Sequence, residues 1–193
     1  MHHIKGPDFP TGGIIQGRQG IKDAFETGRG RIVIRSKTEI EVNDSGRETI
    51  VVTEIPYMVN KREMIEKIAE LVETKKVDGI AYINDETTMK GVRVVIRLKK
   101  DANANVVLNM LYKYSPLQSS FSVNNVALVN GRPRTLNLKQ LIKYFVRHRH
   151  EVVLRRTRFD LEKARKRAHI LEGLLKALDV IDQIINIIRS SKS

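Results

Sequence analysis

The 193-residue sequence contains no cysteine and no tryptophan, and only 5% of its residues are aromatic. Without cysteine the chain has no disulfide framework, no thiolate-bound zinc or iron–sulfur cluster, and no thiol nucleophile. The absence also fits a reducing compartment, and we expect a cytoplasmic protein. Proteins that stack single-stranded bases on aromatic rings usually carry more of these rings, so that class of binder is disfavoured.

Long apolar runs are also missing from the sequence. None approaches the roughly 18 residues that a membrane-spanning helix needs. The first residues, Met1 to Lys5, lack the apolar core of a signal peptide. We therefore expect no membrane partner.

Negative charge is scarce compared with positive charge. The chain has 35 Lys and Arg residues against 22 Asp and Glu residues, which gives a formal net charge of +13. Such an excess favours a polyanionic partner, most often a nucleic acid. Hydrophobic residues make up 41% of the sequence, which is enough for a buried core.

The first two thirds of the chain show both strand and helix patterns, preceded by residues 1–16, which are rich in glycine and proline and read as irregular. A helix is predicted at 21–25 and closed by Gly28. The further expected elements are strands at 31–42 and 48–55, a helix from Asn60 to about 73, strands at 79–84 and 91–99, a helix from Asn103 or Asn105 to about 114, a strand at 117–129 and a turn at 130–133. This order predicts an α+β fold, a layered domain over residues 17–136.

The pattern changes at Asn137, where a long helical arm is predicted to begin. From there to Arg189 the sequence has no proline and only one glycine, Gly173. Small or apolar residues recur at alternating spacings of three and four, which is a heptad pattern. They are Leu154, Thr157, Leu161, Ala164, Ala168, Leu171, Leu175 and Leu178. We expect an arm over 137–193 with a break near Asp179.

The arm also holds the densest cluster of positive charge. Residues 147–167 contain nine Lys or Arg residues and three acidic ones, a surplus of six. Mixed-charge helix faces in solvent are usually balanced, so this excess favours a polyanion nearby, although a solvated face is the simpler alternative. Cations on the predicted strands, which include Arg93, Arg97 and Lys99, could extend the same surface. The candidate nucleic-acid-binding residues are Arg29, Arg31, Arg35, Lys37, Arg147, Arg149, Arg155, Arg156 and Arg158.

Enzyme motifs are largely absent from the sequence. No glycine-rich stretch ends in the Gly-Lys-Ser/Thr of a P-loop, and Gly28-Arg29-Gly30 fits a turn into a strand better than a phosphate cradle. His148 and His150 would lie about 200° apart on a helix, so they cannot share a metal ion. Asp85 and Glu86 are adjacent but have no phosphate site near them. We therefore expect no catalytic group and no metal site in this chain.

Several motifs together resemble the A subunits of the bacterial type IIA DNA topoisomerases, DNA gyrase more than topoisomerase IV. They occur in the family's order and run through essentially the whole chain. The motifs are Gly6 to Thr11, Gly28-Arg29-Gly30, Glu54-Ile55-Pro56-Tyr57, Val59-Asn60-Lys61, Asp101 to Asn105 and Arg167 to Leu174.

The resemblance implies a segment of an ATP-dependent enzyme that cuts both strands of one duplex, passes another through and introduces negative supercoils. Residues 1–16 would lead from an upstream winged-helix domain, 17–136 would form the tower domain, and 137–193 would begin the coiled-coil arm towards the lower dimer gate. The partners would be duplex DNA, a second copy of the A chain and two B subunits, in an A2B2 holoenzyme on the chromosome. The magnesium and ATP sites would lie in the B subunit, with no cofactor in this segment.

The same resemblance implies that the segment alone is inactive. In the family the catalytic tyrosine follows an arginine and precedes Thr-Glu, in the upstream domain. None of the five tyrosines here has this context: they are Tyr57, Tyr82, Tyr112, Tyr114 and Tyr144.

Two other classes of protein stay open on the residues alone. One is an RNA-binding module, which would prefer structured RNA to duplex DNA. The other is a coiled-coil interaction protein with incidental charge, which would self-associate regardless of salt and would not bind DNA.

Overall fold

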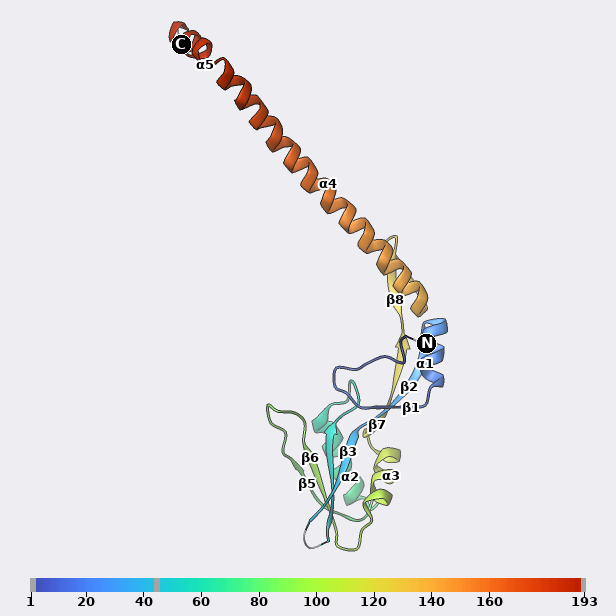
Figure 1. Cartoon of the computed structure of the whole chain (residues 1–193). Coiled ribbons are helices and arrows are strands. Elements are labelled where there is room, and N and C mark those ends of the chain that lie inside the picture. The colour runs from blue at the N-terminus through green and yellow to red at the C-terminus, as the bar shows by residue number, and fades with distance from the viewer. Residues whose placement is uncertain (1–2, 44–45, 192–193) are drawn as a thin grey trace. The chain divides into compact units, whose positions relative to one another are not determined.

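The computed structural model describes residues 3–43 and 46–191 and divides the chain into two compact units, residues 1–139 and 140–193 (Figure 1). The first unit contains β-sheets flanked by helices, and the second is helical. The chain therefore has the expected α+β class, with a long helix at its C-terminal end.

The first sheet has three antiparallel strands in the order β1-β2-β7. They are β1 (Ile14–Gln16), β2 (Arg29–Arg35) and β7 (Gln118–Asn124). The prediction of an irregular segment over 1–16 was wrong at its end, because Ile14–Gln16 pairs with β2. Three residues are too short for a strand pattern to stand out from the surrounding glycines.

Helix α1 (Gln19–Thr27) extends the predicted helix at 21–25 in both directions and packs very closely on β2. Gly28 ends the helix with a left-handed φ of 81°, the conformation that glycine adopts most readily. Gly30 lies directly beneath the helix: a Cβ atom there would overlap the carbonyl oxygen of Gly20 and lie 2.7 Å from the nitrogen of Ala24. Only a residue without a side chain fits this contact.

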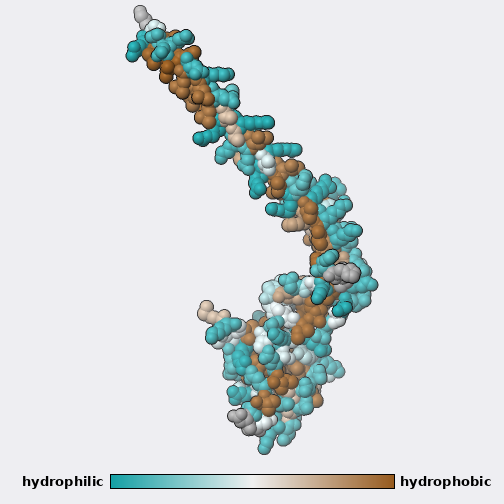
Figure 2. All heavy atoms as spheres, in the orientation of Figure 1, coloured by the Kyte–Doolittle hydropathy of each residue, from teal (hydrophilic) through white to brown (hydrophobic). Residues whose placement is uncertain are grey.

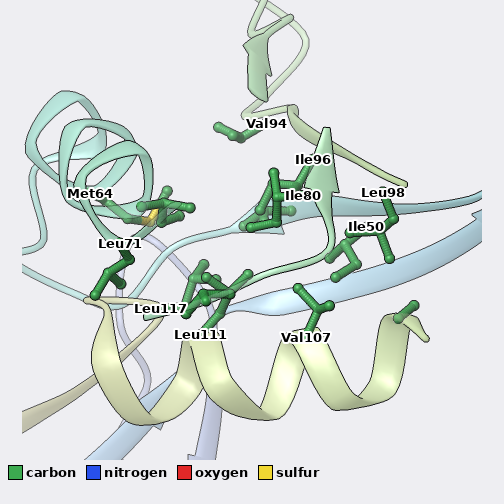
Figure 3. Packing of buried hydrophobic residues seen from close by; sticks show 14 of the residues in the cluster. Ile50, Met64, Leu71, Ile80, Val94, Ile96, Leu98, Val107, Leu111 and Leu117 are labelled. Atoms are coloured by element: carbon green, nitrogen blue, oxygen red, sulfur yellow. The ribbon is translucent and has the colours of Figure 1, made fainter. Parts of the chain in front are cut away.

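The second sheet has four antiparallel strands in the order β3-β4-β6-β5. They are β3 (Lys37–Val42), β4 (Glu48–Glu54), β6 (Val94–Leu98) and β5 (Ile80–Asp85). Helices α2 (Lys61–Glu73) and α3 (Ala104–Tyr114) supply buried residues to the same core, including Met64 and Leu111 (Figure 3). Each helix begins at an asparagine, Asn60 or Asn103, whose side chain accepts hydrogen bonds from backbone N–H groups of the first turn.

The predicted single strand at 31–42 is in fact two strands that belong to different sheets. The chain crosses from one sheet to the other at Ser36, which is fully buried and whose N–H donates to the carbonyl of Leu117 over 2.8 Å. Alternation continues through the crossover in the sequence, so it gave no sign of the break. In consequence Ile32 and Ile34 on β2 are buried, whereas Ile40 and Val42 on β3 are exposed.

The predicted strand at 117–129 also divides, at Asn125, into β7 and β8 (Val126–Val129). Strand β8 pairs with β9 (Arg132–Thr135), whose first two residues were predicted as part of a turn. Only Asn130-Gly131 forms the turn, a residue pair that two-residue hairpins favour. Backbone hydrogen bonds of Asn125 to Gly28 and Leu136 hold the base of this hairpin.

The second unit is built from α4 (Leu138–Asp179) and α5 (Ile181–Ser190). The predicted break near Asp179 is confirmed, since α5 begins two residues later. At 1.5 Å per residue, the 42 residues of α4 extend about 63 Å. No described residue of α4 is buried, and apolar side chains are visible along its surface (Figure 2). Among the described residues, no helix is both long enough and apolar enough to cross a membrane.

Candidate nucleic-acid interface

The register of β2 and β7 places three of the predicted arginines on one face of the first sheet. Directly opposed residues share a face, and Arg29, Arg31 and Arg35 pair with Asn124, Ser122 and Gln118. The alternate residues Ile32 and Ile34 point to the other face and are buried. That buried face belongs to a small core with Ile21 of α1, so the arginine face is the one turned away from this core.

Only part of this arginine face is available to a ligand. Arg29 and Arg31 are exposed and have no carboxylate partner among the described residues. Arg35 is half-buried, its Nε donates to Oε1 of Gln118 over 2.6 Å, and its guanidinium stacks on Tyr112. Lys37 begins the next strand, where its Nζ lies 3.7 Å from Oε1 of Glu54. Arg29 and Arg31 are therefore available to a ligand, whereas Arg35 and Lys37 are engaged by other side chains.

Three polar side chains that were not predicted complete this face. Ser120, Ser122 and Asn124 of β7 are exposed beside the two arginines, and their hydroxyl and amide groups can donate hydrogen bonds to phosphate oxygens. Alternation of these residues with apolar ones in the sequence predicts a strand with one polar and one apolar face. The sequence does not predict that this strand pairs with β2, because the contact between Arg35 and Gln118 joins residues 83 positions apart.

The cations of the second sheet are occupied by neighbours. Arg93 donates to Glu86 and Glu41 over 3.2 Å, and these two hydrogen bonds, that to Glu86 first, raise the pKa of its guanidinium. Arg97 stacks on Tyr82, and Lys99 pairs with Asp78. Two of these three cations, Arg93 and Lys99, are therefore paired with carboxylates, unlike Arg29 and Arg31.

The cations of α4 lie on two sides of the helix. At about 100° per residue, Arg147, Arg155 and Arg158 fall within a sector of about 80°, whereas Arg149 and Arg156 lie on the opposite side. All five are exposed, and Arg147 is paired with Glu151 over 3.2 Å. One straight duplex therefore cannot contact all five of the predicted arm residues from one side.

The glycines, histidines and acidic pair noted in the sequence have structural or solvent-exposed positions. Gly28 ends α1, and Gly30 makes room for it. His148 and His150 are exposed on α4. The carboxylate of Asp85 lies 2.7 Å from Nζ of Lys61, and the carboxylate of Glu86 pairs with Arg93. The described residues bring together no group of three or more metal-binding side chains.

The chain thus combines an α+β domain that has a basic sheet face with a long basic helix. The family can be stated more closely. The whole chain, residues 1–193, matches the family of the A subunits of DNA gyrase and topoisomerase IV, and it belongs to that family.

Its relatives include the DNA gyrase A subunits of several bacteria. The chain is 55% identical over 193 residues to that of Clostridium acetobutylicum, 60% over 192 residues to that of Staphylococcus epidermidis ATCC 12228, and 59% over 194 residues to that of Staphylococcus aureus MRSA252. These alignments cover 99 to 100% of the chain but only 22 to 23% of each relative. The chain thus spans less than a quarter of the length of these relatives.

Proposed function

We propose that this chain is the part of a type IIA topoisomerase A subunit that holds a DNA duplex by its phosphates and connects it to the helical arm. The observation that carries the proposal is the exposed sheet face with Arg29 and Arg31, which no described carboxylate neutralises. The names of the relatives favour DNA gyrase, and topoisomerase IV is the alternative within the family.

Binding through this face would position DNA without reading its sequence. Arginine, serine and asparagine side chains on a sheet surface reach phosphate oxygens, and such contacts fix the position of a duplex but carry no base information. This suits an enzyme that acts on the path and bending of DNA rather than on one fixed sequence.

The chemistry of the whole enzyme would lie outside this chain. We place the catalytic tyrosine in the upstream domain, and ATP and Mg²⁺ in the partner B subunit of an A2B2 holoenzyme that acts on the chromosome in the cytoplasm. In that enzyme the chain would support double-strand passage and negative supercoiling by linking the DNA gate to the lower dimer gate.

Duplex binding at increasing salt tests the proposal. If about four phosphates are engaged, log K should fall against log[salt] with a slope of about −3.6, and unrelated duplexes should bind alike. A flat salt response or strong discrimination between duplexes would contradict it. A preference for structured RNA would instead support an RNA-binding module.

A cleavage assay tests the assignment of the chemistry. The purified chain should neither cut nor relax supercoiled DNA, with or without Mg²⁺. A covalent tyrosine–DNA adduct on this chain would show that the nucleophile lies within residues 1–193.

A further inference from the structure

The outer face of the second sheet, opposite the core, contains a pocket of about 290 Å³. Thr49 lies in register with Glu41 on one side and with Arg97 on the other, so these three side chains share this face. The neighbouring Ile50 points to the opposite face and is buried in the core. Val95 also lines the pocket and is itself buried, which gives the pocket an apolar base. Charged side chains stand around this base.

One wall of the pocket is a network of three charged side chains. Nη2 of Arg93 lies 3.2 Å from Oε1 of Glu41 on β3, and its Nε lies 3.2 Å from Oε2 of Glu86, which follows β5. One guanidinium is thus shared between two carboxylates that come from opposite edges of the sheet. The network holds this wall in place, and it leaves Arg93 without a free charge to offer a ligand.

The other two guanidiniums of the pocket are not neutralised. Neither Arg47 nor Arg97 forms an ion pair with a carboxylate of the residues that the structure describes. The guanidinium of Arg97 stacks on Tyr82, 4.9 Å from the ring centroid, which orients it and leaves its N–H groups free at the edge. The N–H of Arg47 donates to Oδ1 of Asn43 over 2.9 Å, which fixes the backbone there. With the hydroxyl of Thr49, two oriented cations and a neutral donor line the same pocket.

We propose that this pocket binds a compact phosphate group, either as inorganic phosphate or as the terminal phosphate of a small molecule. Arg47 and Arg97 would contact its oxygens through charge-assisted hydrogen bonds, and Thr49 would donate another. The lining holds three arginines and two glutamates, so it carries a net charge of +1, which suits an anion.

The glutamates favour an isolated phosphate group over the backbone of DNA. Glu41 and Glu86 both line the pocket, and with Arg93 they form a network of net charge −1. A DNA strand carries one phosphate for about every 3.4 Å of helix axis, so the neighbours of any bound phosphate would meet these carboxylates. A single phosphate group has no such neighbours. The pocket therefore differs from the open face with Arg29 and Arg31.

A titration followed by backbone amide NMR tests this proposal on the full 193-residue chain. Inorganic phosphate and glycerol phosphate, each added at constant ionic strength, should cause saturable shifts at Arg47, Thr49 and Arg97, whereas chloride should cause none. Arg47→Gln and Arg97→Gln should each weaken phosphate binding by about fivefold or more, because each removes a charge-assisted hydrogen bond. Arg132→Gln is the matched control: Arg132 is exposed on β9 outside the pocket, so this variant should change binding less than about twofold. Shifts that do not saturate, or equal losses in all three variants, would overturn the proposal.

Glu41→Gln provides an arm in which binding should become tighter. The change removes a negative charge from the pocket and frees Nη2 of Arg93, so phosphate affinity should rise by about threefold or more. Amide shifts outside the pocket show whether each variant is folded. Unchanged or weaker phosphate binding by folded Glu41→Gln would contradict the proposal.

Duplex DNA binding separates this proposal from the proposed function. Arg47→Gln with Arg97→Gln should leave the salt slope of duplex binding nearly unchanged, whether or not the face with Arg29 and Arg31 binds DNA. A slope that becomes less steep by about 0.9 for each arginine would overturn the proposal, because the pocket would then belong to the DNA surface.

Discussion

The guanidinium of Arg35 lies over the ring of Tyr112, 4.7 Å from its centroid. The Tyr112 hydroxyl lies 3.0 Å from Oγ1 of Thr38 and donates to the carbonyl of Ser36 over 3.3 Å. One side chain of α3 therefore contacts the residues before, at and after the point where the chain changes sheets.

Tyr112→Phe should lower the free energy of unfolding by about 1 kcal/mol, because it removes these hydrogen bonds and keeps the ring under Arg35. Urea unfolding measures the change. Tyr82→Phe is the matched control. Tyr82 is exposed and also stacks with an arginine, Arg97, so this variant should lower the free energy of unfolding by less than about 0.5 kcal/mol. Equal losses in the two variants would show that the Tyr112 hydroxyl does not stabilise the crossover.

Arg31→Ala and Arg35→Ala should differ in DNA binding although both arginines lie on one sheet face. Arg31 is free to neutralise a phosphate, so its removal should make the salt slope of duplex binding less steep by about 0.9. Arg35 is held by Gln118 and Tyr112, so its removal should leave the slope nearly unchanged. A larger change for Arg35→Ala would show that these contacts break when DNA binds.

Lys61→Ala should lower stability at neutral pH and lose its effect in acid. The hydrogen bond from Lys61, followed by that from Thr87, lowers the pKa of the Asp85 carboxyl. A carboxyl whose pKa is lower in the folded state adds stability above its ordinary value of about 3.9, and this is lost as the pH falls through the folded value. The pair is partly exposed, so the difference should be below about 1 kcal/mol at pH 7. Urea midpoints of both proteins should converge below about pH 4, and a constant gap would contradict the assignment.

Leu161→Glu with Leu171→Glu should reduce self-association or arm helicity while the first unit stays folded. Burying one leucine contributes roughly 1.5–3 kcal/mol, so the exposed leucines of α4 favour association; they are Leu154, Leu161, Leu171, Leu175 and Leu178. Sedimentation and circular dichroism measure the two effects, and protection of backbone amides in residues 17–136 reports on the first unit. Unfolding of that unit would show that the arm forms part of its core.

Local patterns in the sequence predicted most elements but not their partners. Asn60 was readable as a helix cap, the start of the second helix was narrowed to Asn103 or Asn105, and the structure has the cap at Asn103. The heptad pattern and Asp179 located the arm and its break. Ser36 was not readable as a crossover, because charged and uncharged residues continue to alternate through it. Asn125 was missed because the four apolar residues after it were assigned to the same strand. Strand β1 was missed because three residues give too short a pattern.

The same limit applies to the candidate interface. Arg29 and Arg31 could be nominated from their charge, but Ser120, Ser122 and Asn124 join them only through the long-range pairing of β2 with β7. The sequence also could not show that the two other cations are occupied, since Gln118 lies far from Arg35 along the chain, and Glu54 lies on a different strand from Lys37.

The crossover at Ser36 restricts insertions and deletions as well as substitutions. One residue added or removed within Arg29–Arg35 would turn the side chains on one side of the change to the opposite face of the first sheet. Ile32 or Ile34 would then meet solvent while an arginine entered the small core. Because β3 continues directly into another sheet, the displacement could not be absorbed by a loop before Asn43. Length variation among related chains should therefore collect between β3 and β4 and be rare between residues 29 and 42.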